Sequence, residues 1–283
     1  MKKIVMLFMC AFFCVAIFAQ DEKKQGDEMA ASGNYSGAAM MYRLCMEQDE
    51  ECRFQLIRLL YESKIEPQSS NELFQLVNPL AQQGNAEMQL YLGMLYYKGR
   101  GVGEDNREAL KWIQESVKKG FARAQNELGM LNEKGYIVQQ NYSDAVMWYQ
   151  KSADQGYADA QFNLASMYQR QLGVKKAKKN ANLEEAAKWY RKSAEQGHTE
   201  AQNRIALIYQ KGEGVPKNIQ EAIIWYQQSS NNGNADGQYN LGMLYESGQG
   251  VVKNRDRAIE LYQKASAQGH KLAAAKLKKM KVK

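Results

Sequence analysis

Apolar residues recur along the chain with helical spacing, and one arrangement of apolar, small and polar positions returns several times. The segment 92–102, LGMLYYKGRGV, comes back in similar form at 128, 205 and 241. The copies begin at Ala86, Ala122, Ala158, Thr199 and Ala235. A constant period of roughly 20–50 residues is typical of repeat proteins that stack one small structural unit on the next.

Each copy predicts two helices separated by a turn. In the first copy, the apolar periodicity covers residues 86–98 and 106–119. Gly99 and Gly101 interrupt it, as glycines do between helices, and Gly120 is placed to end the second helix. The third copy carries five extra residues within QRQLGVKKAKKNANLEE, between its two predicted helices. We therefore expect this insertion to form a surface loop.

Small residues and tryptophans mark the faces on which these helices should pack. Leu92 is followed by Gly93, and the other copies also have Gly or Ala after the equivalent Leu or Ile. The second helix carries Ala109, with Trp112 three residues later on the same face. We expect the small residues to allow close crossings and the indole rings to fill the space between neighbouring helices.

These residues carry a resemblance to a known family. The pattern A-x-A-Q-x-x-L-G-x-x-Y, then G-x-G-V, then A-x-x-W-Y-x-x-S-A-x-x-G resembles the Sel-one-like repeat (SLR), a relative of the tetratricopeptide repeat (TPR). The resemblance covers residues 86–281 well and 49–85 poorly. It implies an all-α, right-handed solenoid of antiparallel helix pairs and a scaffold function through protein–protein contacts.

The predicted organisation follows from this register. It comprises a signal peptide (1–19), a TPR-like helix pair (20–48), a degenerate repeat (49–85), five SLR units (86–121, 122–157, 158–198, 199–234, 235–270) and a capping helix with a basic tail (271–283). The last helix has no partner after it, and its lysines give it the polar outer face that a terminal repeat needs.

The N-terminus has the pattern of a secretory signal peptide. Lys2 and Lys3 precede an apolar run from Ile4 to Ala19, and Ala19 stands at the expected cleavage site. The run is shorter than the ~20 residues of a membrane-spanning helix, so a membrane anchor is the less favoured alternative. We expect export, cleavage after Ala19, and a periplasmic or extracellular location.

Cleavage there would leave two cysteines, Cys45 and Cys52. An even pair in an exported protein is compatible with a disulfide, here between the end of one predicted helix and the start of the next. Two free buried thiols are the alternative.

The formal net charge of +7 arises mostly at the chain ends, because residues 271–283 carry six lysines and no acid. A second basic run, KKAKK, covers residues 175–179. These segments could contact a membrane or another anionic surface, but a solvated loop and a soluble cap explain them more simply. No aromatic residue lies among the lysines, and we expect no nucleic-acid partner.

No catalytic constellation emerges from the sequence. His198 and His270 occupy equivalent junctions between repeats, and no His/Cys spacing typical of a metal site is present. Ser116 begins an S-x-x-K sequence without its usual K-T-G companion, and serines recur at its repeat position. We therefore expect no enzymatic activity, catalytic residue, cofactor or metal. Cysteine-rich SLR relatives linked to penicillin-like compounds make a cell-envelope hydrolase or penicillin-binding protein the alternative.

The TPR resemblance also implies where a protein or peptide partner would bind, because the first helix of each pair lines a concave groove in that fold. Counting each repeat from its first residue, the variable positions are 5, 9 and 12. They hold Leu90, Met94 and Tyr97; Asn126, Met130 and Glu133; Phe162, Ser166 and Gln169; Asn203, Leu207 and Gln210; and Tyr239, Met243 and Glu246. The apolar residues at position 9 fit packing between repeats equally well, so both roles stay open.

Overall fold

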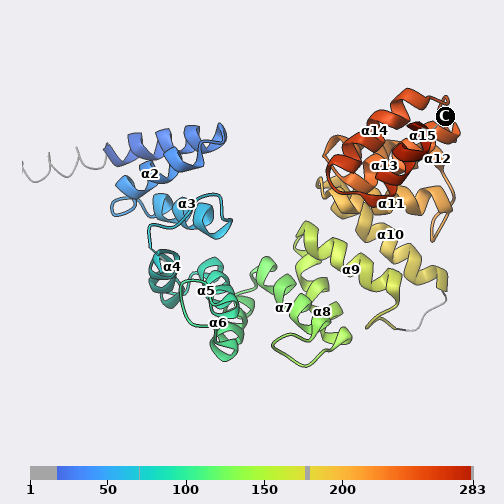
Figure 1. Ribbon diagram of the computed structural model, residues 1–283. Helices are drawn as coiled ribbons and strands as arrows, with labels where there is room; N and C mark the ends of the chain where they lie inside the picture. Colours follow the sequence, from blue (N-terminus) through green and yellow to red (C-terminus); the bar gives the residue numbers. More distant parts are fainter. Residues whose placement is uncertain (1–17, 70, 176–178, 282–283) are drawn as a thin grey trace, which may run out of the picture. The chain divides into compact units, whose positions relative to one another are not determined.

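The computed structural model describes residues 18–69, 71–175 and 179–281. These residues form helices joined by turns, with no strand among them, and consecutive helices pack against each other from α2 (Tyr35–Cys45) to α6 (Asn106–Lys118) and from α7 (Ala122–Lys134) to α15 (Lys271–Lys281) (Figure 1). The predicted all-α architecture of stacked helix pairs is confirmed. Residues 1–17, most of the predicted signal peptide, lie outside the described residues. Among the residues described, no helix is both long and apolar enough to span a membrane.

The chain divides into two compact units, and the first ends at Lys119. Its described helices are residues 18–31, α2 (Tyr35–Cys45), α3 (Glu50–Tyr61), α4 (Glu72–Gln82), α5 (Ala86–Lys98) and α6 (Asn106–Lys118). Its core contains Leu56 and Leu60 of α3, Leu73 of α4 and Leu92 of α5. Helix pairing therefore extends upstream of the clear repeats.

A disulfide joins the first two pairs of this unit. Cys45 at the end of α2 is bonded to Cys52 in α3, with the two Cα atoms 5.9 Å apart. Both cysteines are fully buried. Arg43 of α2 adds a second link across the same region, because its guanidinium lies 2.9 Å from a carboxylate oxygen of Glu72 in α4.

The second unit comprises Gly120–Lys283, and its described residues form four complete helix pairs and a last helix. The helices are α7 (Ala122–Lys134), α8 (Tyr142–Asp154), α9 (Ala158–Arg170), α10 (Lys179–Glu195), α11 (Thr199–Lys211), α12 (Ile219–Asn231), α13 (Ala235–Ser247), α14 (Arg255–Ala267) and α15 (Lys271–Lys281). We call α7, α9, α11 and α13 first helices, and α8, α10, α12 and α14 second helices. Each first helix packs on the second helix that follows it, and each second helix packs on the next helix in the chain.

The insertion in the third repeat forms a loop only in part. α10 begins at Lys179 and has 17 residues, whereas α8 and α12 have 13 each. The prediction of a simple surface loop is therefore wrong for the end of the insertion, which adds a helical turn to α10. This end of α10 is held in place, because Asn182 is only 5% exposed and a Cβ on Gly214 would lie 2.4 Å from the Leu183 backbone.

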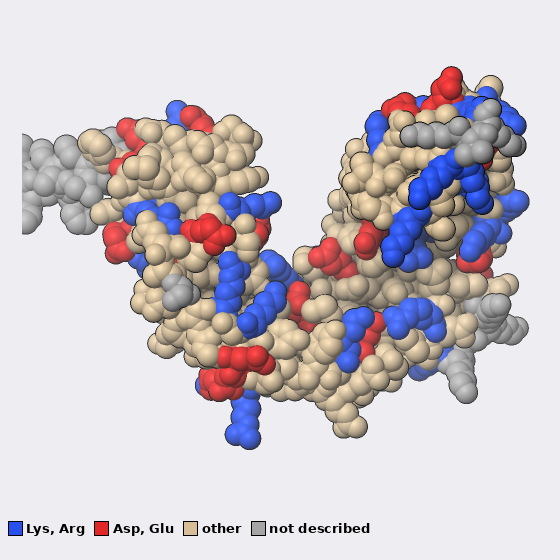
Figure 2. Space-filling model, viewed as in Figure 1, with Lys and Arg blue, Asp and Glu red and all other residues tan. Residues whose placement is uncertain are grey.

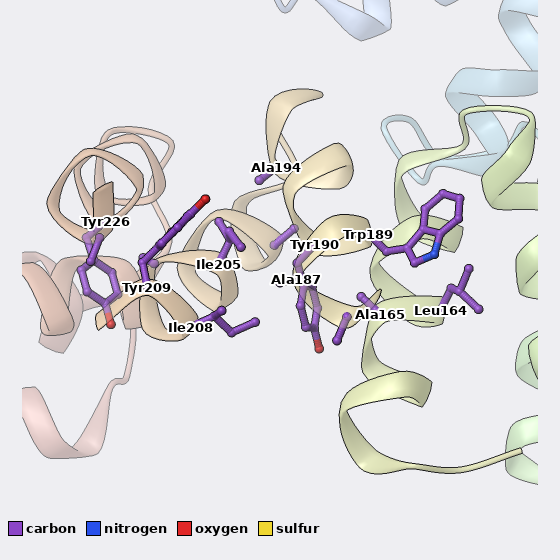
Figure 3. Packing of buried hydrophobic residues seen from close by; sticks show 14 of the residues in the cluster. Leu164, Ala165, Ala187, Trp189, Tyr190, Ala194, Ile205, Ile208, Tyr209 and Tyr226 are labelled. Carbon is purple, nitrogen blue, oxygen red and sulfur yellow. The ribbon is translucent and has the colours of Figure 1, made fainter. Parts of the chain in front are cut away.

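The main aromatic filling of the second unit is a tyrosine that follows each tryptophan position. Tyr149, Tyr190, Tyr226 and Tyr262 are at most 1% exposed. The tryptophans are less completely covered, and Lys151 and Lys192 lie over the rings of Trp148 and Trp189 at 4.2 Å and 4.1 Å. In Figure 3, the rings of Trp189 and Tyr190 leave α10 in different directions. The predicted indole filling is thus shared with a more deeply buried tyrosine.

Candidate protein-interaction surface

Repeat position 12, at the end of each first helix, binds the buried tyrosine of the following second helix. Its side-chain oxygen accepts a hydrogen bond from the tyrosine hydroxyl in all four pairs of the second unit. The bonds are Tyr149–Glu133 (2.9 Å), Tyr190–Gln169 (3.0 Å), Tyr226–Gln210 (2.8 Å) and Tyr262–Glu246 (2.7 Å). Burial raises the pKa of Tyr190 to about 12, so this hydroxyl stays protonated and able to donate. Position 12 therefore has a structural role within each helix pair.

Two position-12 carboxylates also bind a cation from the next helix of the same type. The guanidinium of Arg170 lies 2.6 Å from Glu133, which is only 8% exposed. The ammonium of Lys276 lies 2.7 Å from Glu246. Burial opposes ionisation of Glu246, but hydrogen bonds from Lys276 and Tyr262 lower the pKa of this carboxyl below its usual value.

Repeat position 5 lies at the junction with the next repeat, where two kinds of contact alternate. Asn126 and Asn203 are less than a tenth exposed, and each accepts a hydrogen bond at 2.9 Å from the asparagine at position 6 of the next repeat, Asn163 or Asn240. For these two asparagines, packing between repeats replaces the predicted groove contact.

At the other two junctions an aromatic ring takes the place of the asparagine. Phe162 stacks on His198, and Tyr239 stacks on His270, with ring centroids 4.6 Å apart in both cases. Each histidine caps the helix that it precedes, because its Nδ1 accepts the backbone N–H of Ala201 or Ala273 at 3.1 Å. The histidines therefore are junction residues, as their repeat positions predicted.

Of the three predicted positions, only position 9 is partly exposed in every repeat of the second unit. Positions 5 and 12 are buried at Asn126, Asn203 and Glu133 and partly exposed at Phe162, Gln169, Gln210, Tyr239 and Glu246. Met130, Ser166, Leu207 and Met243 are partly exposed. The neighbouring accessible positions in the second unit are 2, 6 and 13, of which position 13 is exposed in every repeat, as at Lys134, Arg170, Lys211 and Ser247. We call Met130, Ser166, Leu207 and Met243 the position-9 strip. The polar positions beside this strip were not among the predicted site residues, although their variable, charged side chains are typical of an exposed face.

In the first unit, the same positions of α5 are mostly covered. Leu90 is 1% exposed and Met94 is 7% exposed, while Tyr97 is partly exposed. The second helix α6 has Ile113 where the other repeats have the buried tyrosine, so no hydroxyl there requires an acceptor at position 12. Tyr97 stands at that position instead.

Ser116 occupies a structural position. It is fully buried, and its hydroxyl donates a hydrogen bond to the Ala86 carbonyl at 2.6 Å. Ser152, Ser193 and Ser229 make the same bond in their repeats, at 2.7–2.9 Å. The Lys119 ammonium donates to the Gly84 carbonyl. The S-x-x-K residues thus hold a helix pair together, and no group of three or more metal-ligating side chains occurs among the described residues.

Comparison with known proteins identifies the repeat. The Sel1 repeat matches residues 86–121, 122–157, 158–198, 199–234 and 235–270, which are the bounds that the sequence period gives. None of the curated proteins compared with this chain matches it.

Solved structures that resemble the chain at 30% identity or more include the following two. One is c5321, a protective antigen present in uropathogenic Escherichia coli strains and displaying an SLR fold, with a TM-score of 0.66 and 30% identity over 92% of this chain. This chain covers only 56% of c5321. The other is a Sel1 repeat protein from Oxalobacter formigenes, with a TM-score of 0.64 and 32% identity over 75% of this chain and 83% of that one.

Five consecutive repeat matches and these two structures confirm the resemblance seen in the sequence. This chain therefore belongs to the Sel1-repeat family, whose members are generally non-catalytic scaffolds for protein–protein interactions.

Proposed function

We propose that this protein is an exported, non-enzymatic scaffold that holds a segment of a partner protein against the first helices of residues 120–283. The observation that carries this proposal is the position-9 strip. Apolar Met130, Leu207 and Met243 recur at one helical position and stay partly exposed, with exposed polar positions beside them. An apolar centre with a polar rim is the usual composition of a protein interface.

The chemistry of the strip favours an extended or helical peptide segment. Methionine and leucine side chains adapt to apolar anchors of different shapes, and a row of anchors repeated once per helix pair suits a segment that presents side chains at regular intervals. Ser166 stands at repeat position 9 where the other three repeats of the second unit have an apolar side chain. This favours a partner with a smaller or polar group at that point.

Export is supported by the leader-like residues 1–19 and by the Cys45–Cys52 disulfide. Disulfides persist in oxidising compartments and are rare in the cytosol. The absence of enzymatic activity is supported by the structural roles of Ser116, His198 and His270, whose polar groups cap helices or bind backbone carbonyls.

The proposal is tested by replacing the strip and measuring partner capture. The variant is Met130→Glu, Leu207→Glu and Met243→Glu, used as bait for crosslinking in a native envelope extract followed by mass spectrometry. We expect loss of the proteins that the unmodified chain crosslinks, because each glutamate would be desolvated without a partner in the interface. Circular dichroism verifies folding, and a triple Gln variant replaces the Glu variant if the latter unfolds.

The matched control introduces three glutamates at apolar residues of the second unit that lie outside the position-9 strip. Met147→Glu, Ile224→Glu and Val252→Glu change apolar residues that are 40%, 50% and 88% exposed on second helices or a turn. Capture must survive in this control. Equal capture by a folded strip variant, or equal loss in both variants, contradicts binding at the strip.

A further inference from the structure

The last helix forms a basic pocket with the pair before it. A cavity of about 850 Å³ opens between α13, the start of α14 and α15. Its charged lining comprises Lys253, Arg255, Lys276, Lys278, Lys279 and one acid, Glu246. Figure 2 shows Lys and Arg side chains gathered over these C-terminal helices.

The one carboxylate among the described residues that line this pocket is already bound. The Glu246 carboxylate accepts hydrogen bonds from the Lys276 ammonium and the Tyr262 hydroxyl, both at 2.7 Å. The Arg255 guanidinium donates to the backbone carbonyl of Met280 at 2.8 Å. Glu246 thus supplies one negative charge among five cationic side chains, and its attraction to Lys276 and Lys253 offsets only part of their positive charge.

Three lysines of the pocket form no direct ion pair among the residues that the structure describes, although the charge of one of them, Lys253, helps to lower the pKa of Glu246. Lys253 comes from the turn before α14, and Lys278 and Lys279 come from α15, and no ion pair joins any of them to a described carboxylate. Like charges gathered in a concave site repel one another and attract anions. The arrangement is therefore unfavourable without a ligand or counterions and is relieved when an anion binds.

We propose that this basic pocket binds an acidic segment of a partner, with two or more Asp or Glu carboxylates against Lys253, Lys278 and Lys279. This inference rests on the proposed function and names the chemistry of the bound segment. Glu246 belongs both to the pocket and to position 12 of α13, so the pocket adjoins the last residue of the position-9 strip, Met243. A segment bound along the strip would bring its end to these lysines.

Several features favour carboxylates spaced along a peptide. The cavity is much larger than one carboxylate or phosphate group, so it admits several anionic groups at once. Lysine ammonium groups act as mobile point charges that adapt to carboxylates at different spacings. The planar guanidinium of Arg255, the side chain best suited to bidentate phosphate binding, is already engaged with Met280.

The test measures binding of a fluorescent eight-glutamate peptide to the full chain, with an eight-glutamine peptide as reference. The pocket variant is Lys278→Gln with Lys279→Gln, both exposed residues whose replacement leaves the core unchanged. The control variant, Lys188→Gln with Lys264→Gln, removes the same net charge from exposed lysines that pair with Glu185 and Glu260 on their own helices.

We expect the pocket variant to weaken glutamate-peptide binding about tenfold, the sum of two moderate charge interactions, and the control to change it less than about twofold. Rising salt should weaken binding further. Equal loss in both variants, or equal binding of the glutamine peptide, overturns the proposal. Binding to vesicles of anionic lipid that needs Lys278 and Lys279, without binding of the peptide, assigns the pocket to a membrane surface and also overturns it.

The partner-capture assay separates this inference from the proposed function. If the strip variant loses its partners while Lys278→Gln with Lys279→Gln keeps them, only the acidic-segment inference fails. If the strip variant keeps its partners, the proposed function fails whatever the peptide assay gives.

Discussion

The hydrogen bond from each second-helix tyrosine to repeat position 12 leads to a quantitative prediction. Tyr226 is fully buried and donates to the neutral amide of Gln210 at 2.8 Å. Tyr149 is also fully buried, but it donates at 2.9 Å to the carboxylate of Glu133, which Arg170 also binds. The same bond thus has a neutral acceptor in one of these two helix pairs and a charged acceptor in the other.

Replacing each tyrosine by phenylalanine keeps the ring and removes only the hydroxyl. A neutral hydrogen bond contributes about 0.5–1.5 kcal/mol to the free energy of unfolding, and a bond to a charged group contributes about 1.5–3 kcal/mol. Tyr149→Phe should therefore destabilise its helix pair by about 1 kcal/mol more than Tyr226→Phe destabilises its own.

Removing the acceptor should cost more than removing both partners. Gln210→Leu leaves the buried Tyr226 hydroxyl without its acceptor, a loss of about 1–3 kcal/mol. Adding Tyr226→Phe removes the unsatisfied hydroxyl, so the double variant should be more stable than Gln210→Leu alone. The first unit already combines two such changes, since Ile113 and Tyr97 occupy the equivalent positions.

Native-state hydrogen exchange on the full chain is the appropriate assay. Repeat arrays open locally, so one global free energy of unfolding does not describe each helix pair. The free energy of opening is read from amides of α7 and α8 for Tyr149 and of α11 and α12 for Tyr226. Equal losses for the two phenylalanine variants, or a double variant weaker than Gln210→Leu, would refute the reasoning.

Three further predictions concern the backbone, the disulfide and alkaline pH. Gln171 caps the end of α9 with a φ of 57°, and Gly99 caps the end of α5 with a φ of 61°. In urea unfolding, Gln171→Gly should raise the free energy of unfolding by about 1 kcal/mol, and Gly99→Gln should lower it by a similar amount. Shifts of the same sign for the two variants would contradict this. Replacing Cys45 and Cys52 by serine should lower the free energy of unfolding by about 2–3 kcal/mol. Hydrogen exchange should show this loss of protection in the first unit only, and unchanged protection would exclude a disulfide that stabilises this unit. Because the pKa of Tyr190 is raised from 10.0 to about 12, its stabilising contribution should be full below pH 10 and fall between pH 10 and 12, as the unfolded chain alone releases the proton. Tyrosinate absorbance that is absent from a Tyr190→Phe variant and rises before unfolding would contradict this.

The candidate surface could be predicted from the sequence only in part. The register of the repeats left position 9 of the first helices open between a groove and packing between repeats, and the structure leaves this position partly exposed, as at Leu207 and Met243. The same register put Asn126 and Glu133 in a groove, whereas both are buried in hydrogen-bonded contacts. The apolar periodicity of a helix identifies its packed face to within one or two residue positions. Contacts with the neighbouring repeat then decide which residues at the edge of that face are buried.

The sequence by itself determined the repeat length, the order of the helices and the residues that end them, because helix periodicity, capping and glycine turns act over a few neighbouring positions. Only the tertiary structure decided that the tyrosines are buried more completely than the tryptophans, that part of the insertion lengthens α10, and that Lys253 meets Lys278 and Lys279 in one pocket. These features depend on distances between side chains of different helices, which follow from the packing of whole helix pairs.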